Sequence, residues 1–442
     1  MNGMVSNGRR GDQVAQCERG RRIPPVFGAL WFIAALMGGP VLASESPLTV
    51  DEAVQMAVSA NPQVRSSRAR WDSAVHSIKP NYAPADPSVS VFNLDSPTNG
   101  FTNAASQSFQ LNQPLQFPGK GYLQGENARR VADIARLAYE ATVRDVRAQA
   151  ESAFYQIQLD QALNQVATEN REHLRRVLHV AEVAYAANRV TQADFVSAEF
   201  ELAAAEQQQR QLQVAEANDR TTLNQILARP IAERVELDSH IELHPLSARL
   251  DDLVNQAGRV RQEILQAALS AQNAESALML AKLEYAPDFS VGYIFDRFLQ
   301  PSAPPVAGQT ETHGVSLSFT VPLFFWLKQR EDVTRASSDL EAARADVSTV
   351  QAQTAALVTT LFRQAHLTYE TAQLYRDSLT PLAQQGFEVA LVAYEGGKVD
   401  FVTLATALRQ RNDARVAYLQ AANQFLAQRV ALEQAVGQPL KG

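Results

Sequence analysis

The chain uses one phrase twice, first as Pro114-Leu115-Gln116-Phe117-Pro118-Gly119-Lys120 and again as Pro322-Leu323-Phe324-Phe325-Trp326-Leu327-Lys328. Each copy is followed by a very long stretch, 121–187 or 329–395, that is rich in Ala, Gln, Leu, Arg and Glu. These residue types favour helices. A helix of that length extends on the order of 100 Å, which is typical of coiled coils and not of ordinary globular domains. The sequence therefore predicts a duplicated unit that contains a long helix.

Both long stretches stop at a similar break, which predicts a helical hairpin in each copy. The breaks are Tyr185-Ala186-Ala187-Asn188-Arg189-Val190 and Tyr394-Glu395-Gly396-Gly397-Lys398-Val399. Asn188 and Gly397 occupy equivalent places, and both residue types tolerate the left-handed conformation of a tight turn. A second helix then returns, over about 192–228 in the first copy and 401–437 in the second.

A shorter helix precedes each repeated phrase. It opens at Asp51-Glu52-Ala53-Val54 in the first copy and at Asp251-Asp252-Leu253-Val254 in the second. It ends at Tyr82-Ala83-Pro84 and at Tyr285-Ala286-Pro287, because proline lacks an N–H donor and restricts the residue before it. The predicted unit is therefore a short helix, a strand pair and a long helical hairpin.

Alternating segments between the short helix and the repeated phrase predict two strands in each copy. Ser, Asn, Gln, Thr and Gly lie on one face and Val, Leu, Phe and Tyr on the other. The segments cover 89–91, 108–112, 289–293 and 315–321, with loops near 95–105 and 300–312. The two faces indicate a water-filled lumen and a lipid-facing exterior.

Four strands cannot close a barrel, and an open edge in lipid leaves unpaired backbone groups that cost several kcal/mol each. Small membrane barrels need about eight strands, so the barrel must be shared between subunits. The predicted fold class is mainly α with a small β part. Long α-helical coiled-coil hairpins and four strands per protomer form a trimeric 12-stranded β-barrel with an α-helical barrel.

The N-terminus predicts export. Arg19, Arg21 and Arg22 precede a short apolar run that ends in small residues, a pattern typical of a secretory signal peptide. The single cysteine, Cys17, would leave with it, so no disulfide is expected. Without residues 1–43 the formal charge is −10 rather than −7, which disfavours nucleic acid as a partner. The predicted domains are a signal peptide over 1–43, repeats over 44–229 and 250–438, a linker or equatorial segment over 230–249 and a tail over 439–442.

These phrases resemble the TolC family of outer-membrane efflux channels over roughly 48–438. The resemblance is carried by the two turn phrases, with Asp194-Phe195-Val196 after the first, and by Gln113-Pro114-Leu115 and Tyr285-Ala286-Pro287-Asp288-Phe289. The last two look particularly like the heavy-metal cation-efflux branch. Asn188 stands where the family usually has Gly, and Thr403 and Thr406 stand where some members have acidic residues at the narrowest point.

The resemblance implies a trimeric outer-membrane channel of a tripartite efflux system, with its helices in the periplasm of a Gram-negative bacterium. It implies passive exit for substrates, heavy-metal cations among them, delivered by an RND-type inner-membrane pump and a periplasmic adaptor (membrane fusion protein). The other partners are a second and third copy of the chain and outer-membrane lipid. Neither a cofactor nor a resident metal is expected.

The resemblance places site residues at the hairpin tips, and the alternating pattern of the strands adds the membrane-facing aromatics. The expected tip and gating residues are Tyr185, Asn188, Arg189, Asp194, Tyr394, Gly396, Gly397, Lys398, Asp400 and Thr403. The expected adaptor contacts are Val190, Phe195, Val399 and Phe401. The expected membrane-facing aromatics are Phe109, Phe289, Tyr293 and Phe319.

Two interpretations stay open for the charged tip residues. Asp194 and Asp400 form a cation-attracting ring or simply cap helices. Arg189 and Lys398 lock the closed tip or are solvated.

Two other functions compete with the channel. A periplasmic adaptor or coiled-coil scaffold also has hairpins, but an adaptor flanks them with many short strands. An enzyme would need a catalytic constellation, which the sequence lacks. The six-residue spacing of His173 and His179 puts them on opposite helix faces and disfavours a metal pair.

Overall fold

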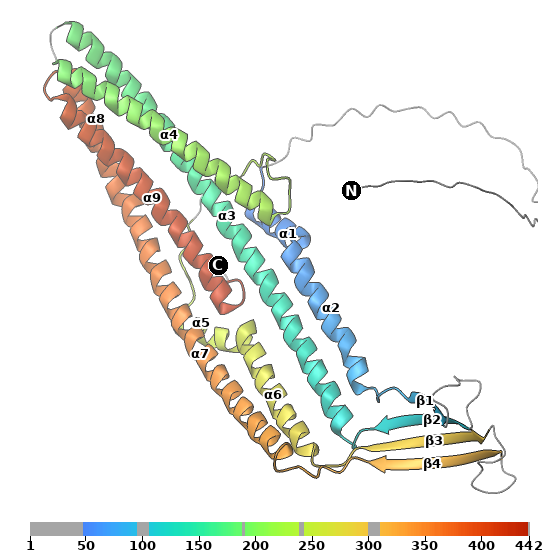
Figure 1. Ribbon diagram of the computed structural model, residues 1–442. Helices are drawn as coiled ribbons and strands as arrows, with labels where there is room; N and C mark the ends of the chain where they lie inside the picture. Colours follow the sequence, from blue (N-terminus) through green and yellow to red (C-terminus); the bar gives the residue numbers. More distant parts are fainter. Residues whose placement is uncertain (1–46, 95–105, 188–190, 238–242, 299–309, 441–442) are drawn as a thin grey trace, which may run out of the picture. The chain divides into compact units, whose positions relative to one another are not determined.

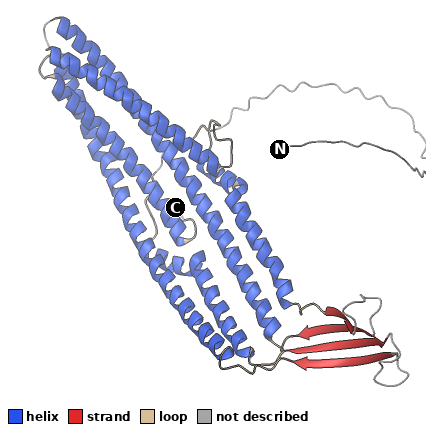
Figure 2. Cartoon of the chain, in the orientation of Figure 1, coloured by secondary structure: helices blue, strands red, loops and turns tan. Residues whose placement is uncertain are grey.

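The computed structural model describes residues 47–94, 106–187, 191–237, 243–298 and 310–440. Helices dominate these residues, with one small sheet (Figures 1 and 2). The predicted mainly α fold with a small β part is confirmed. The predicted signal peptide and the tip residues Asn188, Arg189 and Val190 lie outside the described residues.

The first half of the chain contains two short helices, two strands and a long hairpin. Its elements are α1 (Val50–Ala60), α2 (Pro62–Tyr82), β1 (Ser88–Leu94), β2 (Ser106–Leu115), α3 (Lys120–Ala186) and α4 (Gln192–Ile226). The expected single helix after Asp51 is thus two helices. Asn61 is extended and its side chain accepts a hydrogen bond from Gln63 N (2.8 Å), while Pro62 supplies no N–H to continue α1.

The second half repeats this order. Its elements are α5 (Leu250–Val260), α6 (Gln262–Leu283), β3 (Phe289–Phe298), β4 (Glu311–Phe319), α7 (Gln329–Leu374), a π-helical turn (Tyr375–Leu379), α8 (Thr380–Glu395) and α9 (Phe401–Val436). The break between α5 and α6 at Arg261 needs no proline. Arg261 is extended there, and its guanidinium donates to Ala435 O at the end of α9 (3.0 Å).

The second long stretch differs from the continuous helix that its composition predicts. It is divided by the π-helical turn, in which Thr380 N–H donates to Tyr375 O, five residues back. Pro381 directly follows and has no N–H to bond a carbonyl in the preceding turn. The wider π turn accommodates this missing donor.

The four strands form one antiparallel sheet in the order β1-β2-β3-β4. The central pair joins the two halves of the chain, from Ser106 opposite Phe298 to Leu115 opposite Phe289. β1 and β4 each pair with one neighbour only, so the sheet has two open edges. α2 and α6 each end at the proline-containing connection that leads into the sheet.

α3 is the central helix of the described packing. It contacts α1, α2, α4, α6 and α9, whereas α7 contacts α5, α6 and α9. One core cluster joins α1 and α3 to the end of α4, around Phe154, Ile157 and Leu223. A second joins α5 to α7 and α9, around Leu253, Val358 and Leu432.

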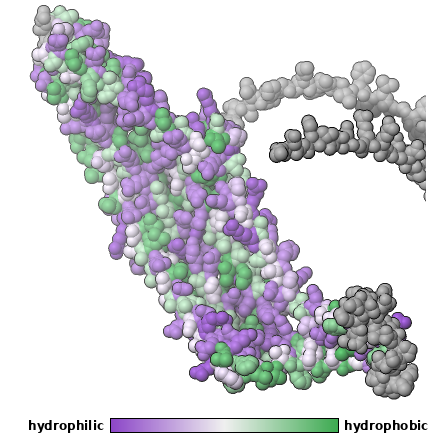
Figure 3. Space-filling view, in the orientation of Figure 1, coloured by the Kyte–Doolittle hydropathy of each residue, from purple (hydrophilic) through white to green (hydrophobic). Residues whose placement is uncertain are grey.

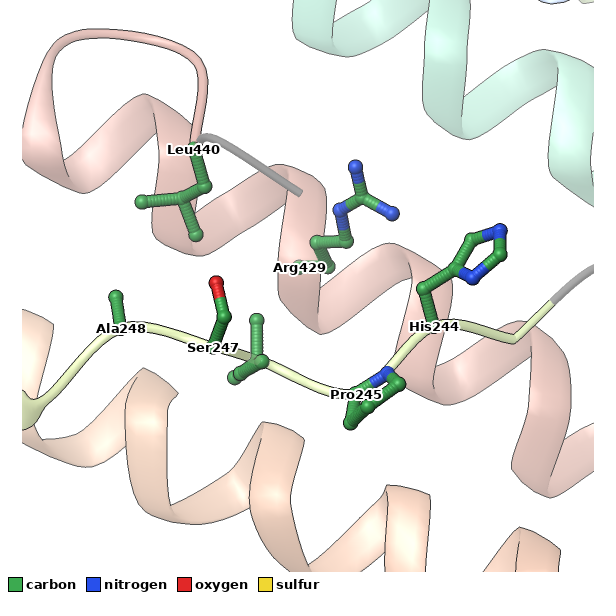
Figure 4. A pocket seen from close by; sticks show the side chains of 7 residues that line it. His244, Pro245, Ser247, Ala248, Arg429 and Leu440 are labelled. Carbon is green, nitrogen blue, oxygen red and sulfur yellow. The ribbon is translucent and has the colours of Figure 1, made fainter.

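Residues 243–249, at the end of the segment between the two halves, lie between α7 and α9 (Figure 4). His244 to Ala248 and Leu440 surround a hollow of about 20 Å³ beside Arg429 (Figure 4). That volume holds a single water molecule and no larger ligand. Leu246 packs on the neighbouring core residues, so this segment serves packing. Among the described residues, no helix is long and apolar enough to cross a membrane.

Candidate functional site

The two hairpin tips meet in one apolar cluster, at the end of the helices opposite the sheet (Figure 1). This tip cluster contains Leu174, Val177, Ala181, Ala198, Ala205, Phe387, Ala390, Tyr394, Phe401, Leu404, Ala405 and Leu408, from α3, α4, α8 and α9. Residues that lie some 200 positions apart in the sequence therefore pack together. The tips are held to each other by buried apolar area, the main stabilising force in such contacts.

The two tyrosines of the turn phrases have different environments. Tyr394 is 7% exposed and its ring packs edge-on against Phe401, with the centroids 6.4 Å apart. Tyr185 is 43% exposed and stacks on Phe195 at 6.0 Å. The second tip is therefore anchored in the tip cluster, and the first presents its aromatic pair nearer the surface.

The Tyr394 hydroxyl is buried and has no hydrogen-bond partner among the described residues. Burial, and then the nearby negative charge of Asp194, raise the pKa of Tyr394. The phenol thus stays protonated and is a donor without an acceptor. A buried hydroxyl without a partner destabilises the packed arrangement of the hairpin tips.

Asp194 and Asp400 both cap helices. Asp194 forms a capping box with Thr191, in which Thr191 N donates to Asp194 Oδ2 (3.1 Å) and Asp194 N donates to Thr191 Oγ1 (3.3 Å). Asp400 accepts from Thr403 N (2.9 Å) and Thr403 Oγ1 (2.6 Å) at the start of α9. These two bonds, the side-chain one foremost, lower the pKa of Asp400. The capping interpretation accounts for both carboxylates in this structure.

A hollow of about 1020 Å³ lies between the hairpin ends, and six of the predicted tip residues line it: Asp194, Tyr394, Gly396, Gly397, Lys398 and Asp400. Thr403 and Tyr185 are not among its lining residues. Gly396 and Gly397 form the second turn, and Gly397 has φ +69°, the left-handed conformation expected there. Lys398 is exposed, and its ammonium contacts no described residue through an ion pair. Val399 packs against the tip cluster. Phe401 is 3% exposed, so an adaptor could touch its ring only after the hairpins part.

A layer of charged and polar residues lies next to the tip cluster, and sequence reasoning missed it. Glu169 of α3 accepts a hydrogen bond from Arg415 of α9, which is the largest cause of its lowered pKa, and its carboxylate lies 3.8 Å from the buried Arg411. The Arg411 guanidinium also lies over the Phe387 ring, 5.3 Å from its centroid. This layer ties the first hairpin to the second. No sequence signal reveals it, because α3 and α9 meet only in the folded chain.

A buried carboxylate was also missed. Asp160 of α3 is 4% exposed and interacts with Asp219 of α4. Burial, and then the hydrogen bond with Asp219 and its charge, raise the pKa of Asp160 to about 7. Asp160 therefore takes up a proton at a higher pH than an exposed aspartate does.

The predicted strand aromatics lie on one face of the sheet. Phe109, Tyr293 and Phe319 are exposed there with Val315 and Leu317, and Phe289 packs edge-on against Phe319. Further large apolar side chains are exposed in the connection from β4 to α7, namely Leu323, Phe324, Phe325, Trp326 and Leu327. Figure 3 shows hydrophobic colouring gathered where the helices meet the sheet. Contact of these aromatics with lipid stays a prediction.

At the same junction, an ion pair joins the two halves of the chain. Lys120 begins α3 and is 2% exposed, and its Nζ lies 3.0 Å from Asp288 Oδ1 and 3.3 Å from Glu284 Oε1. Asp288 also accepts from Phe117 N (2.8 Å). Burial acts to raise the pKa of Asp288, but the Phe117 N–H and the Lys120 ammonium outweigh it and lower the pKa. The motifs Gly119-Lys120 and Pro287-Asp288 are therefore two sides of one contact.

Comparison with known proteins agrees with this architecture. The cobalt-zinc-cadmium resistance protein CzcC of Cupriavidus metallidurans is 19% identical over 406 residues, which cover 92% of this chain and 91% of CzcC. The CmeC outer membrane channel of Campylobacter jejuni superposes with a TM-score of 0.75 at 14% identity, covering 88% of this chain and 85% of CmeC. The outer membrane protein VceC of Vibrio cholerae gives 0.74 at 14% identity, covering 89% and 97%.

A family model described as outer membrane efflux protein matches residues 53–229 and 253–438, one segment in each half of the chain. These segments contain both hairpins, both strand pairs and the Lys120–Asp288 contact. The match confirms the resemblance found in the sequence. The chain belongs to the outer membrane efflux protein family, and its function is transport through an outer-membrane channel rather than enzymatic catalysis.

Proposed function

We propose that three copies of this chain form one efflux duct, which gives passive exit to substrates handed over by a periplasmic adaptor and an inner-membrane pump of the RND type. The observation that carries the trimer is the sheet with two open edges, β1 and β4. Three such sheets joined edge to edge supply twelve strands, enough to close a barrel, whereas one cannot. The repeats over 44–229 and 250–438 then alternate around the axis.

The exposed aromatic face of the sheet supports a lipid-facing exterior for this barrel. Val315, Leu317 and Phe319 point to the same side as Phe109 and Tyr293, as the register of β2, β3 and β4 requires. Aromatic side chains stabilise barrels at the membrane boundary. The polar strand face, with Ser108, Gln110 and Asn112, would line the lumen.

We propose that the hairpin tips are the gate. The tip cluster and the Glu169–Arg415 layer hold the second hairpin against the first, and opening requires that these contacts separate. The adaptor would stabilise the open arrangement through the tips, with Val190, Phe195, Val399 and Phe401 as candidate contacts. A gate of this kind needs an element that can adopt two arrangements. We propose that the two unequal tips are this element.

We propose heavy-metal cations as substrates. The support is the similarity to CzcC, a cobalt-zinc-cadmium resistance protein, over nearly the whole chain. The described residues contain no group of three or more His, Cys, Asp or Glu side chains placed to hold a metal ion. The protein would therefore conduct the cation and leave selection to the pump.

Fractionation, gel mobility and conductance test the channel. We expect the chain in the outer-membrane fraction, a trimer on an unheated denaturing gel, and low conductance in a planar bilayer that rises when Asp194, Lys398 or Arg189 is replaced. A soluble periplasmic monomer would contradict the channel, and a wide-open wild type would contradict the gate. A deletion strain should become sensitive to cobalt, zinc and cadmium; sensitivity to drugs alone would contradict the proposed substrate.

A further inference from the structure

Near the sheet, the two halves of the chain are joined by an ion pair between a lysine and an aspartate. A lysine at the start of a long helix, Lys120, meets the Asp288 carboxylate in the connection between a short helix and a strand. The contact sits beside the β2–β3 pair and the packing of α3 on α6. It therefore runs from the helical hairpin of the first repeat to the short helix of the second.

The chain holds the same two residue types in the reverse order. Lys328 precedes α7 as Lys120 begins α3, and each follows its proline, Pro322 or Pro114, by six residues. Asp86 follows Tyr82-Ala83-Pro84 as Asp288 follows Tyr285-Ala286-Pro287, one residue further along. The second repeat thus carries the lysine and the first repeat the carboxylate of a second, quasi-equivalent contact.

This second contact is not made within one chain. Lys328 and Asp86 are both exposed, and neither side chain forms an ion pair or hydrogen bond with a described residue. The strands and helices next to Lys328 and Asp86 also lack the neighbours that their equivalents beside Lys120 and Asp288 have. β4 and β1 have open edges where β2 and β3 pair, and α7 does not pack on α2 as α3 packs on α6.

The residues just before Lys328 form an exposed apolar run. Leu323, Phe324, Phe325, Trp326 and Leu327 are all between 49% and 69% exposed. At the equivalent place in the first repeat, Phe117 is partly buried and its N–H donates to Asp288. A large exposed apolar run marks a surface that binds a protein or a membrane, and the unpaired lysine at its end favours a protein that offers a carboxylate.

We infer that the occupant is a second copy of this chain, and that Lys328 of one protomer pairs with Asp86 of the partner subunit. The inference rests on the proposed trimer and names its contact. Around a closed ring, three intramolecular Lys120–Asp288 pairs alternate with three intermolecular Lys328–Asp86 pairs. Pairing of β4 with the partner's β1 remains antiparallel, because it repeats the relation of β2 to β3.

The two kinds of pair differ in one respect that the sequence fixes. Lys120 has a second carboxylate within reach, Glu284, whereas Asn81 stands at the corresponding position of the first repeat. Lys328 therefore meets one acid where Lys120 meets two. We expect the intermolecular pair to be the weaker of the two, since fewer negative charges attract the lysine.

Cross-linking of the full-length chain tests the contact. In a Cys17→Ser background, Asp86→Cys combined with Lys328→Cys should give covalent dimers and trimers with a short bismaleimide, and each single variant should not. The matched control, Lys120→Cys with Asp288→Cys, should cross-link within one chain and give no higher oligomer. If unheated gels show the trimer but the 86/328 pair yields no covalent oligomer, the inference is wrong and the proposed function stands. If no variant or wild type forms a trimer, the proposed function itself fails.

Charge reversal supplies an independent readout. Lys328→Glu should weaken the trimer roughly tenfold per interface, measured as the protein concentration at which it dissociates. Adding Asp86→Lys should restore it, because the pair is then formed with opposite polarity. Arg330→Glu makes the same charge change at a nearby exposed position and should have little effect. A loss in Lys328→Glu that Asp86→Lys does not restore would contradict the pairing.

Discussion

Lys120 Nζ lies 3.0 Å from Asp288 Oδ1, although 168 residues separate the two in the sequence. The lysine is 2% exposed and the carboxylate side chain 40%. The pair links the start of the longest helix to the connection that enters the third strand. It thereby fixes the helical part of one repeat to the strand pair of the other.

Loss of the carboxylate should be more harmful than loss of the lysine. Asp288→Asn leaves a buried ammonium with Glu284 alone, which should cost about 3 kcal/mol. Lys120→Met leaves a carboxylate that water can still reach, and should cost less. The temperature of heat-induced loss of the helical circular dichroism signal, in detergent, measures both. Equal losses in the two variants would contradict this prediction, because they would mean that the unequal burial of the two side chains does not set the cost.

Gly125 should not tolerate a side chain. An added Cβ would overlap the ring carbons of Tyr82, where α2 packs on α3, so Gly125→Ala should destabilise by about 1–3 kcal/mol. Gly258→Ala is the control, because nothing lies near its Cβ and alanine favours the helix by up to about 1 kcal/mol. Tyr82→Ala should relieve the Gly125→Ala defect. The thermal midpoints of these variants decide whether glycine is required at position 125 by the close approach of α2 to α3 or by helix propensity.

Two substitutions of Tyr394 should distinguish the effect of packing at the tips from that of hydrogen bonding. Tyr394→Phe removes a buried hydroxyl that lacks a partner, so the hairpins should stay closed and gain up to about 1 kcal/mol. Tyr394→Ala opens a cavity in the tip cluster at a cost of about 3–5 kcal/mol and should raise single-channel conductance. Tyr185→Ala, at an exposed position, should raise it less. An open Tyr394→Phe channel would mean that the hydroxyl itself holds the gate.

Asp160 should make stability depend on pH. Its pKa is about 7 in the fold and near 4 in the unfolded chain, so the folded protein binds more protons between these values. Stability should therefore fall as pH rises from about 4 to 7 and level off above, by at most about 4 kcal/mol. Asp160→Asn should remove this slope and raise the thermal midpoint at pH 8. Asp219→Asn should also flatten it, because it removes the charge that opposes ionisation of Asp160. A slope that survives both changes would place its origin elsewhere.

Much of the architecture was readable from the sequence because it depends on local chemistry repeated twice. Pro84 and Pro287 end the short helices by removing a donor, and alternation of side chains marks the strands. Gly397 takes the left-handed conformation expected of the tight turn. Because the unit is duplicated, its strand pair occurs twice, and the structure has the four strands that this predicts. That these strands need further subunits to close a barrel stays a prediction.

Other features were decided only by tertiary structure. The break at Asn61-Pro62 follows from a proline. At Arg261 the backbone is extended without one, and the guanidinium donates to Ala435 O on α9, a contact that the local sequence does not predict. The π-helical turn at Tyr375–Leu379, the Glu169–Arg415 pair and the burial of Asp160 likewise depend on which helices lie together. Lys120 and Lys328 occupy matching places in the sequence, yet one is buried in an ion pair and the other is exposed. The physical reason is that local sequence sets backbone conformation, whereas burial and charge pairing depend on neighbours that only the folded chain supplies.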